Sequence, residues 1–475
     1  MHMKNYKNTY CNPMKVENYP MGYDVVDAVP PHRSLSDPSV IYYEGKWYMY
    51  PSYAMAWVSE DFINWKECPI EPRDIGWAPT VVLHKGKFYL FSGREKCILY
   101  VSDGPLGPFK PLGSMLKPNG EIQNAPDPML FSDDDGRLYC YFHYKFPGTP
   151  SGHYSIAGVE LNPDNPVQAI TEPKCLITFD PEHTWECFGA RNQHKGLAWI
   201  EGPWMVKIKG RYYLTYSASG TAFGTYATGA YYSDEGPLSG FVYQKRNPIC
   251  SRNYGLVRGG GHGSIVEGPN NTYWSFYTIP ISYSYKFERL IGMDPIEIDE
   301  NGEIMTVTNT DTPQWAPGLV SDPYDNGNTG LLPLTINTPA EASSSAPGRD
   351  SLYAVDENLQ SWWQPDKNDT EKTLTLDLRG NYTASAMRII WRDVNINPDE
   401  NRVAGAFQYK VSVSVDNKNW TTVVDKSDNK TDYLIDYEVF DTVRANFVRL
   451  TVVGSPEGIE PGIIDFTVFG EYYEE

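Results

Sequence analysis

The sequence has few cysteines, no long apolar run and a deficit of positive charge. Its seven cysteines, in 475 residues, are odd in number, show no C-x-x-C spacing and all precede residue 251. A disulfide framework or a zinc site is therefore not expected, although one bridge is compatible with the pattern. No apolar run approaches about 20 residues, which excludes a transmembrane helix.

The charge balance is acidic, with 40 Lys and Arg against 60 Asp and Glu and a formal net charge of −20. Nucleic acids and anionic membrane surfaces attract basic proteins, so we expect no nucleic-acid partner and no membrane insertion. A neutral ligand such as a glycan is compatible with this charge. The length predicts about two to four domains.

Aromatic residues, glycine and proline are abundant. The chain has 35 Tyr, 13 Trp, 40 Gly and 37 Pro. This mixture favours many short strands joined by tight turns over helices. We therefore expect an all-β protein.

One phrase recurs five times. Each copy is a turn followed by alternating aromatic and aliphatic residues, and each follows a short apolar strand, as in a β-hairpin. Units of about 40 to 50 residues with four strands are typical of β-propeller blades. An ordinary sandwich with repeated hairpins is the alternative, but it has no reason to repeat one upstream element five times. The copies are GKWYMYPS (45–52), GKFYLFSG (86–93), GRLYCYFH (136–143), GRYYLTYS (210–217) and NTYWSFYT (271–278).

Eight or nine residues before each turn, the five copies hold Asp37, Ala78, Asp127, Glu201 and His262. The innermost strand of every propeller blade lines the central channel, so equivalent positions at its start converge at one mouth. Three carboxyl groups and an imidazole should therefore meet around the axis.

Carboxyl groups that flank a glycosidic bond can hydrolyse it: one protonates the leaving oxygen while the other activates water or attacks carbon. The protonating acid must stay neutral, so burial or a nearby negative charge has to raise its pKa. A third carboxylate can supply that charge.

Five segments in order carry a family resemblance that covers roughly residues 9–318. They are SDPSVIYYEGKWYMY, WAPTVVLHKGKFYLF, NAPDPMLFSDDDGRLYCYF, IEGPWMVKIKGRYYLTYS and GHGSIVEG. Together they resemble the blade motifs of glycoside hydrolase family 43, inverting enzymes on a five-bladed propeller. The resemblance implies that Asp37 is the general base, that Glu201 is the general acid and that Asp127 tunes and orients Glu201.

The same resemblance implies substrate-binding roles for three further residues. His262 matches the axial histidine, Trp77 the aromatic ring beside the sugar, and Arg289 an arginine that meets the substrate. Each of these assignments has an ordinary structural alternative: Asp before Pro often begins a turn, a lone histidine is more often structural, and Trp77 and Arg289 would also suit a core ring and a surface cation.

The pattern of the sequence changes after the propeller motifs. We predict a propeller over 1–318, a linker over 319–345 and a discoidin-like β-sandwich or jelly roll over 346–475, whose strands alternate with period two. The run EASSSAPGRDSLYAVDENLQSWWQPD and the strands after it resemble the discoidin or coagulation factor 5/8 C-terminal module, a fold shared with family 32 carbohydrate-binding modules. The resemblance places Trp363 in the core.

Such modules often hold a structural calcium ion, which takes oxygen ligands. The resemblance assigns Asp356 and Asp465 as ligands, with ordinary turn and edge acids as the alternative. No cofactor is expected for catalysis.

The predicted function is an inverting, exo-acting glycosidase that removes α-L-arabinofuranosyl or β-D-xylosyl units from plant-type oligosaccharides or polysaccharides. Galactosides are an open alternative, and a sugar-binding propeller without catalysis is the rival. No secretory signal opens the chain, but the start MHMKN reads as an expression scar, so this absence says little about the natural compartment. For a glycosidase of this kind we expect a periplasmic or extracellular location.

Overall fold

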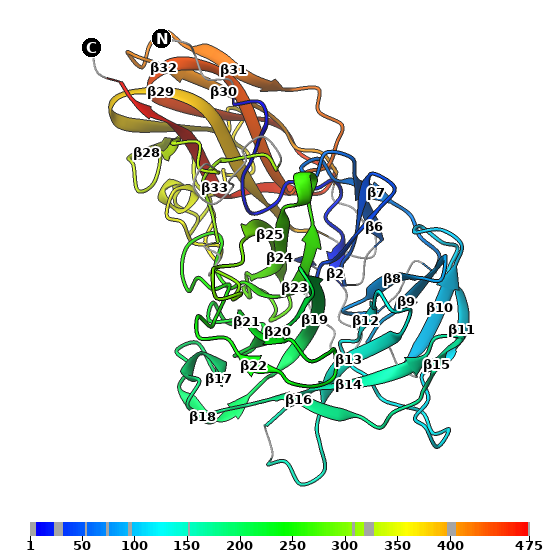
Figure 1. Cartoon of the computed structure of the whole chain (residues 1–475). Helices are drawn as coiled ribbons and strands as arrows, with labels where there is room; N and C mark the ends of the chain where they lie inside the picture. Colours follow the sequence, from blue (N-terminus) through cyan, green and yellow to red (C-terminus); the bar gives the residue numbers. More distant parts are fainter. Residues whose placement is uncertain are drawn as a thin grey trace.

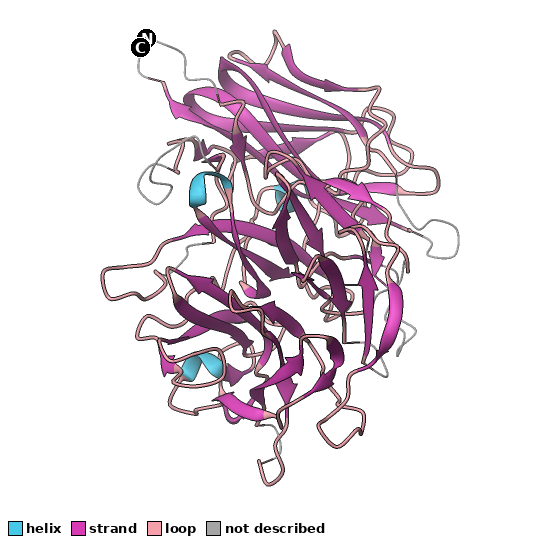
Figure 2. Cartoon of the chain, turned by 45° about the vertical axis from the view of Figure 1, so that its right-hand side comes forward, coloured by secondary structure: helices cyan, strands magenta, loops and turns pink. Residues whose placement is uncertain are grey.

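Five antiparallel sheets follow one another along the first two thirds of the chain. The computed structural model describes residues 6–22, 32–52, 55–72, 76–93, 97–150, 153–305, 309–317, 327–396 and 405–473. Strands dominate, with only short helical turns among the described residues (Figure 2), which confirms the predicted all-β class.

The sheets are five blades numbered in chain order, and every repeated phrase forms the second strand of one (Figure 1). The blades comprise β4 (Ser39–Tyr43), β5 (Lys46–Tyr50), β6 (Ala56–Ser59) and β7 (Lys66–Cys68); β8 (Thr80–His84), β9 (Lys87–Phe91), β10 (Ile98–Ser102) and β11 (Lys110–Ser114); β12 (Met129–Ser132), β13 (Leu138–Tyr144), β14 (Ser155–Asn162), β15 (Asn165–Ala169) and β16 (Lys174–Thr178); β19 (Glu201–Ile208), β20 (Arg211–Ala218), β21 (Ala227–Ser233) and β22 (Val242–Tyr243); and β23 (Gly261–Glu267), β24 (Tyr273–Pro280) and β25 (Arg289–Ile296).

The first strand of each blade contacts the first strands of two neighbours, so β4, β8, β12, β19 and β23 form a closed ring. Side chains link the inner strands: the Val40 N–H donates to Ser264 Oγ at 3.1 Å, and the Leu130 N–H donates to Thr80 Oγ1 at 3.4 Å. The predicted five-bladed propeller is confirmed.

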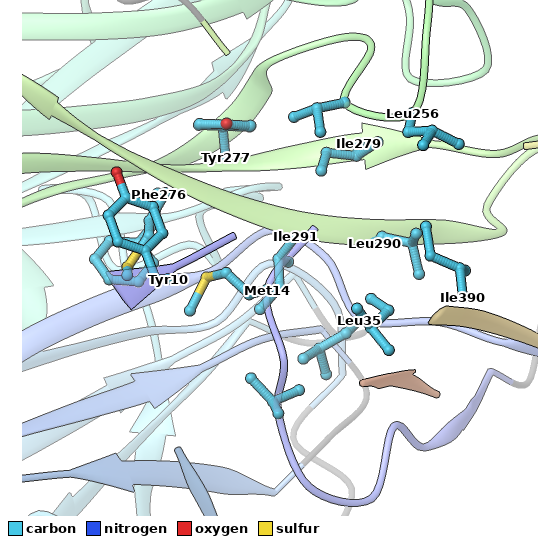
Figure 3. Close-up of a cluster of buried hydrophobic side chains, with 14 of the residues drawn as sticks. Tyr10, Met14, Leu35, Leu256, Phe276, Tyr277, Ile279, Leu290, Ile291 and Ile390 are labelled. Atoms are coloured by element: carbon cyan, nitrogen blue, oxygen red, sulfur yellow. The ribbon is translucent and has the colours of Figure 1, made fainter. Parts of the chain in front are cut away.

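The N-terminal segment completes the last blade, whose own sheet has three strands. The Met14 N–H donates to Ile291 O at 2.9 Å, and the Asn12 side chain bonds both the N–H and the C=O of Met293. Figure 3 shows Met14 packed beside Ile291. β1 (Thr9–Tyr10) pairs with β26 (Gln314–Trp315), so residues from both ends of the propeller lie together.

The C-terminal domain is a seven-stranded antiparallel sheet that folds into the predicted sandwich (Figure 1). In residues 373–378 of β29 and along most of β30 every second residue is buried, as the period-two pattern predicted, whereas residues 384–391 of β29 are all buried. Trp363 is fully buried, as the resemblance implied. The strands are β27 (Leu332–Pro333), β28 (Ala340–Ala342), β29 (Thr373–Val394), β30 (Gln408–Ser414), β31 (Thr421–Lys426), β32 (Ile435–Gly454) and β33 (Glu460–Tyr472).

Part of the predicted linker belongs to this sheet. β27 pairs with β33 and β28 pairs with β29, so the sheet starts before residue 346. Residues 319–326 of the predicted linker lie outside the described residues.

All seven cysteines are described, and each is a free thiol. Within the described residues, no helix has the length and the apolar character needed to cross a membrane.

Candidate active site

A residue at the start of each inner strand, or two positions before it, has a left-handed backbone. The φ angles are 53° at Asp37, 46° at Ala78, 48° at Asp127, 58° at Gly202 and 29° at His262. Such angles are uncommon outside glycine. Because they recur in all five blades, they are a regular part of the blade structure.

In the fourth blade the left-handed residue is Gly202, so the count that placed Glu201 at the equivalent position was one residue off. A Cβ atom on Gly202 would lie 2.7 Å from Cγ of the His262 ring, far inside normal contact distance. The position therefore requires glycine, and the carboxyl group comes from the preceding residue.

In three of the five repeats, the side chain of the eighth residue bonds to the backbone of the next blade. The Ala78 N–H donates to Ser52 Oγ at 2.7 Å, and the His262 N–H donates to Ser217 Oγ at 2.5 Å. Thr278 Oγ1 of the fifth blade accepts from the N–H of Asp37 at 2.9 Å, which closes the circle. These hydroxyl groups satisfy backbone donors that would otherwise be buried without a partner.

The second and third repeats hold Gly93 and His143 at that eighth position. A Cβ on Gly93 would lie 2.4 Å from the Trp77 ring, so the glycine makes room for that indole. The eighth-position pattern is present in the sequence, and sequence reasoning missed it.

One pocket of about 520 Å³ lies at the convergence of the inner strands, and all six residues predicted for catalysis and substrate binding line it. Sequence reasoning missed several of its other lining residues: His143 ends the third repeated phrase and was overlooked, and the others lie outside the phrases. The predicted six are Asp37, Trp77, Asp127, Glu201, His262 and Arg289, and the missed residues include His143, Phe188, Trp199, Phe223, Tyr285 and Phe287.

On one side of the pocket, the Asp37 carboxylate is surrounded by donors. Oδ1 accepts from Nη1 of Arg289 at 3.0 Å and lies 3.5 Å from Nδ1 of His262. Oδ2 accepts from Ser52 Oγ at 2.6 Å and Ser36 Oγ at 3.1 Å. Burial alone would raise the pKa of Asp37, but Arg289, His262 and the two hydroxyl groups outweigh it and hold the pKa below its ordinary value. Asp37 is an ionised carboxylate.

On the other side, Glu201 has the opposite electrostatic environment. Burial, followed by the negative charge of Asp127, raises the pKa of Glu201 well above its ordinary value. A hydrogen bond of 2.7 Å from the Tyr226 hydroxyl to Oε1 works against this rise without cancelling it. Glu201 is therefore suited to hold a proton near neutral pH.

His143 joins the two acids on this side. One carboxylate oxygen of Asp127, one ring nitrogen of His143 and one carboxylate oxygen of Glu201 lie within 4.8 Å of one another. Burial lowers the pKa of His143, against the opposing charge of Asp127. The imidazole also meets the rings of Tyr154 and Trp199 edge-on, with centroids 4.5 Å and 6.0 Å away.

The family model described as "Glycosyl hydrolases family 43" matches residues 32–304, and the model of the F5/8 type C domain matches residues 339–463. The chain belongs to glycosyl hydrolase family 43. It is a glycoside hydrolase, and its substrate is a carbohydrate.

Relatives agree with this family 43 membership, and a solved structure agrees with the fold. A "Xylosidase/arabinosidase" of Bacteroides ovatus is 25% identical over 59% of this chain and 97% of that protein. "Xylosidase/arabinosidase 43A" of Humicola insolens is 28% identical over 57% of this chain and 96% of that protein. The crystal structure of a thermostable family-43 glycoside hydrolase aligns with a TM-score of 0.52 at 24% identity, over 65% of this chain and 99% of that one, which supports the fold.

The predicted calcium ligands of this family 43 enzyme lie in the C-terminal domain. Asp465 is 1% exposed, and its carboxylate already pairs with Arg388 at 3.0 Å and accepts from Thr467. Because Arg388 neutralises that charge, Asp465 does not fit a calcium site. Asp356 accepts from the Asn358 N–H and the Ser361 hydroxyl, as a turn residue does.

Proposed function

We propose that this family 43 enzyme hydrolyses glycosides with inversion, with Asp37 as the general base and Glu201 as the general acid. The observation that carries the proposal is the opposite shift of two pKa values within one pocket. Asp37 takes a proton from the water that attacks the anomeric carbon, and Glu201 gives its proton to the leaving oxygen. Asp127 keeps Glu201 protonated until that step.

Inversion requires room for the attacking water between the base and the sugar. The two catalytic carboxyl groups of inverting glycosidases lie about 6.5–9.5 Å apart, against about 5 Å in retaining enzymes. Asp37 and Glu201 come from the first and the fourth blade, whose inner strands are not neighbours in the ring, which supports the wider arrangement.

We infer that the substrate is a terminal α-L-arabinofuranosyl or β-D-xylosyl unit at a non-reducing end. Aromatic rings line the pocket between its polar groups, and ring faces pack well against the apolar faces of sugars. Both relatives described above carry the name xylosidase/arabinosidase, which supports a pentoside.

The remaining proposals concern the location of the enzyme, its partners and calcium binding. A plant-type polysaccharide substrate supports a periplasmic or extracellular location and glycan binding by the C-terminal domain. The net charge of −20 supports the absence of a nucleic-acid partner. Calcium in the C-terminal domain stays a prediction, and it would need ligands other than Asp465.

A panel of aryl glycosides tests the function, with proton NMR of the first sugar released. We expect hydrolysis of an arabinofuranoside or a xyloside and an initial product of inverted anomeric configuration. Retained configuration would contradict the roles given to Asp37 and Glu201. Glycan binding without hydrolysis of any glycoside would favour a non-catalytic propeller.

A further inference from the structure

One wall of the pocket is a loop of the fifth blade that also contacts the C-terminal domain. We call residues 281–288, which join β24 to β25, the rim loop. Its residues Tyr285, Lys286 and Phe287 line the pocket, and the residue that follows it, Arg289, reaches Asp37.

Glu288 is the internal anchor of the rim loop. It is 1% exposed, and its Oε2 accepts from the N–H groups of Tyr283 at 3.2 Å and Ser284 at 2.9 Å. Its Oε1 forms an ion pair with Arg392 of β29, and Arg392 also donates to Ser284 Oγ at 2.7 Å. A buried carboxylate needs such a partner, so the internal order of the loop depends on a residue of the other domain.

Two further contacts bind the rim loop to the C-terminal domain. Nε2 of Gln360 donates to Ile281 O at 2.9 Å and to Ser282 O at 3.1 Å. The Trp362 ring meets Tyr283 edge-on, with centroids 5.1 Å apart. The domains also share a core beneath the loop, where Figure 3 shows Leu290 of β25 beside Ile390 of β29.

The propeller itself holds the two ends of the loop. Arg258 donates to Pro280 O and Ile281 O at one end, and Ser34 Oγ donates to Phe287 O at 2.8 Å at the other. The propeller also meets the middle of the loop, where the His32 ring lies 5.8 Å from that of Tyr285. Tyr283, Ser284 and Glu288 are held from the C-terminal domain.

We propose that the C-terminal domain is a positioning part of the active site, in which Arg392 acts through Glu288 to hold the rim loop and so to place Arg289 against Asp37. The inference rests on the proposed role of Asp37 as the base. It gives the C-terminal domain a positioning role in the active site that is separate from any glycan binding.

The placement of Arg289 has a measurable consequence. The charged and titratable groups that face Asp37 are Arg289, His262, Tyr226 and, across the pocket, Glu201. If the rim loop loosens, the guanidinium leaves its 3.0 Å contact and the pKa of the base rises. The acidic limb of the pH profile of kcat/KM, which reports the base of the free enzyme, should then move to higher pH.

The first test is hydrogen exchange of the full-length protein, which requires no substrate. Arg392→Ala should speed exchange at the amides of Tyr283 and Ser284 by at least about tenfold, and Arg392→Lys should keep part of the protection. Arg449→Ala is the matched control, because Arg449 lies in the same domain, donates to Thr375 and covers the Trp420 ring. Equal exchange in Arg392→Ala, Arg449→Ala and wild type would overturn the inference.

The second test is the pH profile of kcat/KM. Arg392→Ala should lower kcat/KM by roughly 10- to 100-fold and move the acidic limb to higher pH, Gln360→Ala should do so less, and Arg449→Ala should match wild type. The double variant Arg289→Ala/Arg392→Ala should be little worse than Arg289→Ala alone, because both changes act through one contact. Additive losses, or an unmoved limb, would overturn the inference. If the wild type hydrolyses nothing, the proposed function fails, and the exchange measurement still decides the role of Arg392.

Discussion

The two sides of the pocket bury their carboxyl groups almost equally, with Asp37 5% exposed and Glu201 9% exposed. Their pKa values nevertheless move in opposite directions. On the base side, Arg289 and His262 of the fifth blade face Asp37, whereas on the acid side Asp127 of the third blade faces Glu201. Burial makes both groups sensitive to their neighbours, and the sign of the neighbouring charge decides which group gives a proton and which takes one.

Blocking each side separately is the strongest way to test this difference. Asp37→Asn and Glu201→Gln should each lower kcat by roughly 10²- to 10⁴-fold on a sugar leaving group. On a dinitrophenyl glycoside, whose leaving group needs no protonation, Glu201→Gln should recover much of its loss and Asp37→Asn should not. Steady-state rates on the two substrates check this, and equal behaviour of both variants would contradict the assignment of roles.

Removing the anion from the acid side should make the two sides more alike. Asp127→Asn removes the negative charge that helps to raise the pKa of Glu201. That pKa should fall, so the acid loses its proton earlier and the basic limb of kcat/KM moves to lower pH. We also expect kcat/KM to fall by roughly 10²-fold, because the residue beside the acid changes. A basic limb that stays in place would show that burial alone sets the pKa of Glu201.

A smaller change should move the same limb the other way. The Tyr226 hydroxyl stabilises the ionised form of Glu201, so Tyr226→Phe should raise its pKa further and shift the basic limb to higher pH. We expect kcat/KM at neutral pH to change by less than about tenfold, because a single hydrogen bond is lost. Measured beside Asp127→Asn, this variant controls for general damage to the acid side, since damage would not reverse the sign.

The five-bladed fold and four pocket residues could be predicted from the sequence because the repeat itself is visible. Five copies of one phrase place Asp37, Asp127 and His262 at matched offsets, and strands of one blade architecture must then converge. The family resemblance added Trp77 and Arg289, which lie outside those offsets.

The shift from Glu201 to Gly202 was missed although the sequence records it: in four blades a proline follows the left-handed residue, and Gly202 precedes Pro203. Other features could not be predicted from any local pattern. The grip of Arg392 on Glu288 joins residues 104 positions apart, in two domains that the sequence presents as separate units. The pairing of Arg388 with Asp465, which removes a predicted calcium ligand, likewise depends on the folded sheet.

The left-handed residues before the inner strands also bear on how the enzyme can evolve. A non-glycine residue with a positive φ costs about 1–3 kcal/mol, and Asp37 and Asp127 both occupy such positions. Glycine would relieve that strain and would also remove the acid. Selection for thermal stability alone would therefore favour losing the catalyst, so activity and robustness compete at the same two backbone positions.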